Sequence, residues 1–204
     1  MYKVGITGEL GSGKTYISGL FRDLGVQIYN SDTRLKDIQN SDPELRQSII
    51  DFLGEESYNG SVLNRKWVAG VVFNDPTKLS KLQSLVIPYQ LRDFYDFCEI
   101  HKGEVFILIE SAILYETGWD ELVDLIIYVQ VPERKRIERA QKRDGITPED
   151  YKARMANQVP IFYKAKDSDW IIHNFTDEPK NSKVKQIYDE IIEGDKFAQS
   201  GKLK

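Results

Sequence analysis

The sequence predicts an α/β fold in which helices cover both sides of a parallel sheet. Short, continuous apolar runs, typical of strands buried on both faces, alternate with segments of helical periodicity. The first run, residues 3–7, leads into GELGSGKT at 8–15, a glycine-rich stretch set between a strand and a helix. Polar residues follow the strand ends, where parallel sheets bind their ligands: Thr7, Asn30, Glu110, Gln130 and Asn174.

Five strands and the helices between them account for most of the chain. A helix over 15–24 follows the glycine-rich stretch, because its apolar residues recur at i, i+3, i+4 and i+7, and Gly25 is expected to end it. A basic helix is predicted over 132–143, Thr147 is expected to cap a second helix, and the apolar residues of 184–191 mark the closing helix. The strands are predicted at 3–7, 26–29, 105–109, 125–131 and 170–172.

The segment between the second and third strands is predicted to be helical. Ser41 and Glu44 have the spacing of a capping box. Asp75-Pro76 opens a further helix, which Pro88 is expected to interrupt because proline lacks the amide N–H. The D-x-x-G at 51–54 lies at the end of an amphipathic helix, so it predicts a helix stop rather than a GTPase switch.

These elements predict three parts along the chain. Residues 1–32, 102–131 and 165–204 form a nucleotide-binding core with a parallel five-stranded sheet. Residues 33–101 form a helical insertion. Residues 132–164 form a lid.

Composition restricts the class of protein. Hydrophobic residues make up 41% and charged residues 29% of the 204 residues, as in ordinary globular proteins. The net charge of -4 argues against nucleic-acid binding, and the apolar runs are too short to span a bilayer. A single cysteine, Cys98, and no apolar leader indicate a reducing, cytoplasmic compartment. We expect a monomer or a small homo-oligomer.

The glycine-rich stretch fits the phosphate-binding pattern G-x-x-x-x-G-K-[ST]. Its backbone N–H groups and the start of the next helix favour an anion, so a nucleoside triphosphate is the expected ligand. Lys14 is expected to reach the β- and γ-phosphates, and the Thr15 hydroxyl to bind Mg²⁺. A glycine-rich turn that binds nothing is the alternative. The residues expected to contact the nucleotide here are Gly11, Ser12, Gly13, Lys14, Thr15 and Tyr16.

Three carboxylates are candidates for chemistry. Asp32 follows the second strand, where a base could accept the acceptor's proton or help to order Mg²⁺; a helix N-cap is the alternative. Glu110 ends a buried strand and is the expected magnesium-side partner of Thr15, with a solvated strand end as the alternative. Glu116 faces either the acceptor site or the solvent.

The segment RKRIERAQKR at 134–143 holds six basic residues and one acidic residue. A solvated basic helix is the common explanation for such a run. Its position directly after a strand is where nucleotide kinases carry a lid, whose arginines stabilise the transferring phosphoryl group. Arg139 and Arg143, one helical turn apart, are the candidates for this role.

An ordered set of motifs resembles the dephospho-CoA kinase family from Lys3 to about Ile192. They are KVGITGELGSGKT, LGVQIYNSD at 24–32, VFNDPTKLSKLQSLVIP at 72–88, ESAILYETGW at 110–119, VPERKRIERAQKRDGIT at 131–147 and DWIIHN at 169–174. The resemblance implies ATP-dependent phosphorylation of the ribose 3′-hydroxyl of dephospho-coenzyme A, with the acceptor bound by the helical insertion at 33–101. It implies Asp32 as the base, Lys14 and Thr15 as phosphate and magnesium ligands, and Arg139 and Arg143 as lid arginines. It also implies that Asn174 lies near the ATP base, although a turn asparagine is the local alternative.

The sequence departs from the family pattern at three places. The Asp-Ala-Asp of the family is Asn30-Ser31-Asp32 here, which keeps the last carboxylate. A His-Pro pair is Ile87-Pro88, and Glu110 and Ala112 replace an aspartate and a proline. Another P-loop kinase for a nucleoside or a sugar is the main alternative. A non-catalytic nucleotide switch is a second one, although the N-K-x-D that reads guanine is absent from the sequence.

Overall fold

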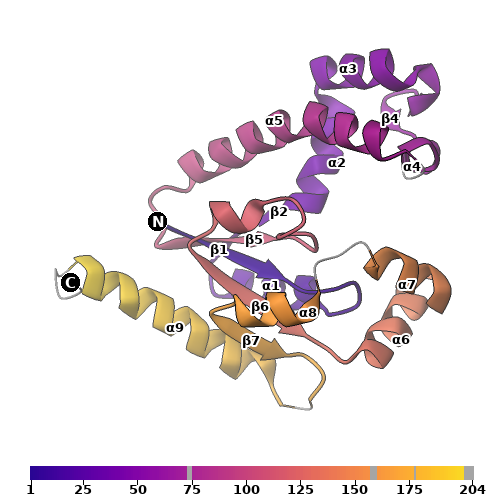
Figure 1. Ribbon diagram of the computed structural model, residues 1–204. Helices are drawn as coiled ribbons and strands as arrows, with labels where there is room; N and C mark the ends of the chain where they lie inside the picture. The colour runs from indigo at the N-terminus through magenta and orange to yellow at the C-terminus, as the bar shows by residue number, and fades with distance from the viewer. Residues whose placement is uncertain (73–74, 157–159, 177, 200–204) are drawn as a thin grey trace. The chain divides into compact units, whose positions relative to one another are not determined.

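The computed structural model describes residues 1–72, 75–156, 160–176 and 178–199, and it contains a five-stranded sheet in the order β2-β5-β1-β6-β7 (Figure 1). β1 pairs in parallel with β5 and with β6, and β7 pairs in parallel with β6. The predicted α/β class with a parallel five-stranded sheet is therefore confirmed. The strands are β1 Tyr2–Thr7, β2 Gln27–Asn30, β5 Phe106–Glu110, β6 Leu125–Gln130 and β7 Trp170–His173.

The chain divides into two compact units. Residues 1–29 and 101–204 form the first, here called the sheet unit, and residues 30–100 form the second, the helical unit. Among the described residues, no helix combines the length and the apolar character that crossing a bilayer requires.

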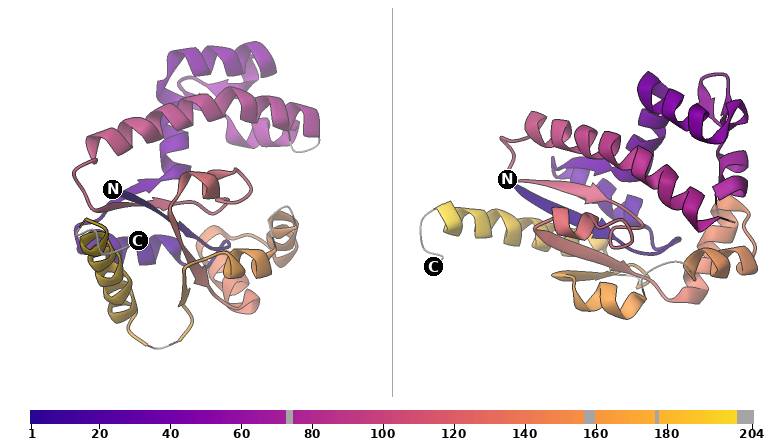
Figure 2. Two further views of the ribbon diagram at one scale, coloured as in Figure 1. Left: turned by 60° about the vertical axis from the view of Figure 1, so that its left-hand side comes forward. Right: turned by 45° about the horizontal axis from the view of Figure 1, so that its top comes forward.

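Two helices cover one face of the sheet, α1 (Lys14–Asp23) and α9 (Lys180–Gln199) (Figures 1 and 2). Alternate strand residues such as Val4 and Ile6 pack there against Phe21 of α1 and Ile187 of α9, all without solvent exposure. On the other face, the side chain of Leu114 lies against Gly5, where a Cβ would stand 3.0 Å from it. Because every residue of β5 is buried, its first four residues, 106–109, are all apolar, and Glu110 at its end is buried as well.

A helical hairpin follows β6 in the sheet unit (Figure 1). It consists of α6 (Glu133–Asp144) and α7 (Pro148–Met155), and α8 (Ile161–Lys166) comes next before β7. Gly145, with a φ of +66°, ends α6, and the Thr147 hydroxyl accepts a hydrogen bond of 3.1 Å from the Asp150 N–H at the start of α7. The predicted cap is confirmed.

The helical unit has its own core. Leu45, Ile49, Tyr58, Val68 and Val86 are buried together there. A two-stranded antiparallel hairpin, which the periodicity did not predict, turns at Gly60 with a φ of +61°. The elements are α2 (Ser31–Ser41), α3 (Pro43–Leu53), the 3₁₀ helix Glu55–Ser57, β3 (Tyr58–Asn59), β4 (Val62–Leu63), α4 (Arg65–Val72) and α5 (Pro76–Ile100).

Two local predictions for the helical unit are wrong, and one is confirmed. α5 continues through Pro88, because its packing against α2, α3 and α4 outweighs the missing N–H. Asp42, and not Ser41, caps α3, since its carboxylate accepts from the Glu44 and Leu45 amides. Gly54 ends α3, as the interpretation of the D-x-x-G motif predicted.

Candidate active site

The phosphate loop connects β1 to α1. Gly11 and Gly13 have φ values of +83° and +84°, in the left-handed region that glycine adopts without strain. A Cβ at Gly11 would collide with the Arg136 carbonyl oxygen, and one at Gly13 with the Asn174 amide. The loop is closed by a hydrogen bond of 3.0 Å from the Ser12 N–H to the Glu9 carbonyl. Its glycines are therefore required by backbone angle and by space.

Lys14 is the first residue of α1, and its ammonium folds back over the loop. The Nζ atom donates to the Gly8 carbonyl at 2.6 Å and to the Glu9 carbonyl at 3.5 Å. A cation held at the loop by carbonyl oxygens can exchange them for phosphate oxygens, which carry a full charge. Tyr16, also predicted to contact the nucleotide, is half exposed on α1.

Thr15 and Glu110 meet directly. Glu110 is the last residue of β5, next to Ile6 of β1 in the sheet register, and is 5% exposed. The Thr15 hydroxyl donates to its carboxylate at 2.5 Å. The alternative of a solvated strand end is therefore wrong for Glu110.

The pair has the oxygen chemistry that Mg²⁺ requires. In the described part of the chain, no group of three or more His, Cys, Asp or Glu side chains could hold a metal ion. Mg²⁺ in nucleotide sites is held by one or two protein oxygens together with phosphates and waters. One hydroxyl and one carboxylate in contact fit that requirement.

Arg139 and Asn174 donate hydrogen bonds to the backbone of the phosphate loop. The Asn174 amide donates to the Ser12 carbonyl at 2.8 Å. Arg139 donates to the Asn174 carbonyl at 2.9 Å and to the Gly11 carbonyl at 3.5 Å. The structure thus brings both predicted residues to the loop, although they lie far from it in the sequence.

Arg143 has a different environment. Its side chain is largely exposed and makes two hydrogen bonds of 2.8 Å to the carboxylate of Asp144. This pairing raises the pKa of Arg143, so the guanidinium is charged at every physiological pH. Of the two predicted lid arginines, Arg139 contacts the phosphate loop and Arg143 is paired with Asp144.

Asp32 lies in the helical unit, in the first turn of α2. The N-cap of this helix is Asn30, whose side chain accepts from the Thr33 N–H at 2.9 Å. The alternative that Asp32 caps the helix is therefore wrong. Asp32 follows Ser31 at the start of α2 and is exposed.

Several charged residues of the sheet unit were not predicted to interact. Glu116 forms an ion pair of 2.9 Å with Lys164, which is completely buried, so the alternative that Glu116 faces the solvent is wrong. Glu9 of the phosphate loop is buried with Arg136 of α6. The signal in the sequence for Glu9 was a charged residue at one of the unspecified positions of the G-x-x-x-x-G-K-[ST] pattern.

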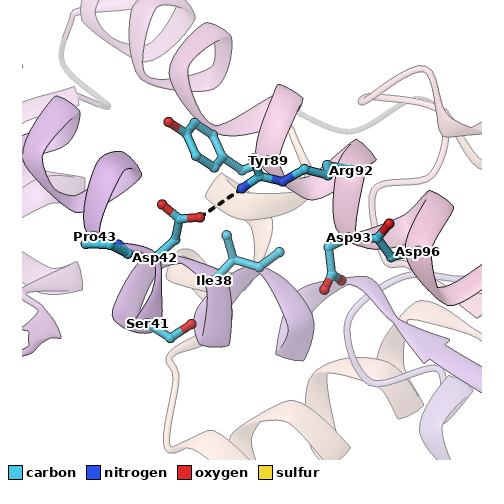
Figure 3. A pocket seen from close by; sticks show the side chains of 8 residues that line it. All are labelled: Ile38, Ser41, Asp42, Pro43, Tyr89, Arg92, Asp93 and Asp96. Atoms are coloured by element: carbon cyan, nitrogen blue, oxygen red, sulfur yellow. Dashed lines mark hydrogen bonds and ion pairs between the residues drawn. The ribbon is translucent and has the colours of Figure 1, made fainter.

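The helical unit contains a cavity of about 340 Å³ between α2 and α5 (Figure 3). At its wall, Arg92 forms an ion pair of 2.9 Å with Asp42 (Figure 3). Arg34 makes a two-pronged contact with Asp93 nearby. Exposed pairs of this kind are worth under about 1 kcal/mol, so both arginines can exchange a carboxylate for another anion. The lining residues are Ile38, Ser41, Asp42, Pro43, Tyr89, Arg92, Asp93 and Asp96.

Comparison with solved structures agrees with the fold. Solved structures with the same fold include a Thermus thermophilus protein (TM-score 0.81, 24% identity, 95% of this chain and 97% of that one) and a dephospho-CoA kinase from Campylobacter jejuni (TM-score 0.69, 22% identity, 94% and 98%). A shikimate kinase from Acinetobacter baumannii is more distant (TM-score 0.51, 15% identity, 100% of this chain and 96% of that one).

Sequence relatives are more specific. Dephospho-CoA kinases from Porphyromonas gingivalis and Bacteroides fragilis are each 34% identical, the first over 78% of both chains and the second over 87% of this chain and 86% of its own. The sequence model of the dephospho-CoA kinase family matches residues 2–179, a span that contains the phosphate loop, the whole helical unit and the basic helix. The chain therefore belongs to the dephospho-CoA kinase family.

Proposed function

We propose that the protein transfers the γ-phosphoryl group of ATP to the ribose 3′-hydroxyl of dephospho-coenzyme A, giving coenzyme A and ADP in the last step of coenzyme A biosynthesis. The observation that carries the proposal is the family match over residues 2–179, because it includes the helical unit as well as the phosphate loop. A phosphate loop alone is compatible with many acceptors.

The sheet unit supplies the groups for the nucleotide. Lys14 leaves the Gly8 carbonyl for the β- and γ-phosphate oxygens, and the loop amides and the start of α1 bind the remaining charge. The Thr15 hydroxyl and the Glu110 carboxylate, which contact each other, would hold Mg²⁺. When bound, this ion neutralises charge that develops on the phosphate oxygens.

The transfer requires a base and charge stabilisation. Asp32 accepts the proton of the 3′-hydroxyl, whose oxygen bonds to the γ-phosphorus while the bond from that phosphorus to the β–γ bridging oxygen breaks. The electron pair of the broken bond stays on ADP. Arg139 and Arg143 stabilise the phosphoryl group in transfer. The exposed side chain of Asp32 and the position of α2 directly after β2 support the role as base.

The cellular setting follows from the substrates. ATP and a coenzyme A precursor are available in the cytoplasm, which is where we propose that the enzyme acts. We expect a monomer or a small homo-oligomer, and size-exclusion chromatography with light scattering measures which of them exists.

The test is an ADP-release assay with a panel of acceptors. The panel contains dephospho-coenzyme A, nucleosides, a sugar, shikimate and water alone, each with ATP and Mg²⁺. We expect rapid ADP release with dephospho-coenzyme A only, and a product carrying one new phosphate on the ribose by mass spectrometry and ³¹P NMR. Lys14→Ala serves as the inactive control. Equal or faster turnover with another acceptor would contradict the proposal.

A further inference from the structure

A buried ion pair lies beneath the phosphate loop. Glu9 belongs to the loop and Arg136 to the first turn of α6, and both side chains are only 4% exposed. Arg136 Nη1 lies 3.4 Å from Glu9 Oε2, and the Tyr128 hydroxyl of β6 donates to the same oxygen at 2.9 Å. Three elements of the sheet unit therefore meet at one carboxylate.

The neighbouring loop residues contact the same helical hairpin. The Tyr151 hydroxyl of α7 donates to the Leu10 carbonyl at 3.1 Å. At Gly11, the backbone of Arg136 lies so close that no Cβ would fit. Arg136 also stacks over Tyr151, 6.0 Å from the ring centroid. Residues 9–11 are thus held, one after another, by α6 and α7.

The hydroxyl of Tyr128, which contacts Glu9, remains a hydrogen-bond donor. Burial, and then the charge of Glu9, raise the pKa of Tyr128 well above its ordinary value. Burial also raises the pKa of Tyr151. Both phenols therefore stay protonated across the physiological range, and the contacts to Glu9 and Leu10 persist.

Fold stability does not account for this pair. Burying two charges costs several kcal/mol of desolvation, so apolar residues of similar volume are often equally stable. The compensation is incomplete as well, since Glu9 Oε1, Arg136 Nε and Arg136 Nη1 have no hydrogen-bond partner among the described residues, and the contact of Nη1 with Glu9 is an ion pair without a hydrogen bond. A charged pair in this position is better explained by what it holds in place.

We propose that Glu9 and Arg136 are positioning residues for the nucleotide. Through their ion pair, α6 holds loop residues 9–11 in the conformation that binds phosphate. The same pair fixes the start of α6, so that Arg139, almost one turn later, stays at the Gly11 and Asn174 carbonyls. This inference rests on the proposed nucleotide site.

The test compares three variants, Glu9→Gln, Arg136→Met and the double variant, by calorimetric titration with Mg²⁺–ATP and by steady-state kinetics. Each single variant leaves one buried charge unpaired, so both should lose thermal stability. The double variant should recover that stability. We expect all three to bind ATP about ten- to a hundredfold more weakly, as for a small displacement of catalytic groups, with an unchanged KM for the acceptor.

Two further variants sharpen the comparison. Glu138→Gln removes an exposed pair with Arg134 on the same helix, where the side chains are 59% and 90% exposed, and should change neither stability nor ATP affinity. Arg136→Lys keeps the charge and should restore part of the ATP affinity that Arg136→Met loses.

The double variant shows whether the Glu9–Arg136 pair positions the phosphate loop for ATP or only stabilises the fold. If it regains both stability and wild-type ATP affinity, the pair is only structural and the inference is wrong, even where a single variant fails to fold. A wild-type protein that binds ATP but phosphorylates another acceptor would overturn the proposed function and leave this test intact. A wild-type protein that binds no ATP would overturn both.

Discussion

Alanine substitutions at Gly13 and at Gly19, which lie less than two helical turns apart, should change the free energy of unfolding in opposite directions. Gly13 is the N-cap of α1 with a φ of +84°, and an added Cβ would collide with the amide of Asn174. Gly19 lies inside α1, and an added Cβ would meet no atom within 4 Å. The pair Gly13→Ala and Gly19→Ala therefore tests whether the loop geometry is as tight as the structure describes.

The magnitudes follow from these contacts. Gly13→Ala imposes left-handed strain of roughly 1–2 kcal/mol and displaces the Asn174–Ser12 hydrogen bond, worth about 0.5–1.5 kcal/mol. Its expected cost to the free energy of unfolding is the sum, roughly 1.5–3.5 kcal/mol. Gly19→Ala should instead stabilise the protein by about 0.5–1 kcal/mol, because alanine loses less backbone entropy in a helix.

Urea unfolding measures the difference, followed by the fluorescence of Trp119, which is buried in the same unit and stacks on Tyr29. Calorimetric titration should show ATP binding roughly tenfold weaker or worse for Gly13→Ala, since one lost hydrogen bond to phosphate is worth that much. Gly19→Ala should bind ATP as the wild type does. Equal stabilities and equal affinities for the two variants would refute the argument from loop geometry.

Three other predictions concern the site and the sheet unit. Asp32→Asn should lower kcat by at least about a hundredfold with ATP affinity kept; full turnover removes the assignment as base. Arg143→Ala should lower kcat about tenfold or more with little change in the Kd for ATP, whereas Arg139→Ala should weaken ATP binding because its guanidinium braces the loop. If both variants match the wild type in kinetics and titration, neither Arg139 nor Arg143 acts on the nucleotide. The Trp170 indole donates to Glu190 at 2.7 Å and lowers the pKa of that carboxyl, so its stabilising effect is present above the unfolded-state pKa and lost as pH falls through the folded-state value. Trp170→Phe should therefore cost up to about 1 kcal/mol in urea unfolding at pH 7 and less at pH 3; a cost independent of pH would exclude the hydrogen bond as its source.

Elements with strong periodicity could be predicted from the sequence. β5 was recognisable because burial on both faces requires an unbroken apolar run. The phosphate loop was recognisable because its glycines and its flanking strand and helix occur together. The predicted interruption at Pro88 was wrong, since the continuity of α5 depends on the helices packed around it. The hairpin at Gly60 was missed because its strands are two residues long, although Asn59-Gly60 is a typical turn dipeptide.

Contacts between distant residues were the least predictable part of the site. Glu9 and Arg136 are separated by more than a hundred residues, and Lys164 and Glu116 lie on different elements. Nothing in the local sequence distinguishes a buried charge from an exposed one, because its partner is supplied by the fold. The position of Asn174 after a strand indicated the ligand-binding edge of the sheet, whereas its place near the nucleotide was implied by resemblance; its contact with the Ser12 carbonyl adds a physical reason for its presence.

The contacts of α6 and α7 with the phosphate loop limit which part of the predicted lid, residues 132–164, can move. Arg136 and Arg139 tie α6 to the phosphate loop, and Tyr151 ties α7 to it. Between these contacts in the sequence lies Arg143, which donates two hydrogen bonds to the exposed carboxylate of Asp144. Releasing an exposed ion pair costs under about 1 kcal/mol, while a transferring phosphoryl group offers a stronger, doubly hydrogen-bonded anion. We therefore expect closure to move the Arg143 side chain and the turn that follows it, and not to rotate the whole hairpin, because such a rotation would break the buried ion pair of Glu9 and Arg136.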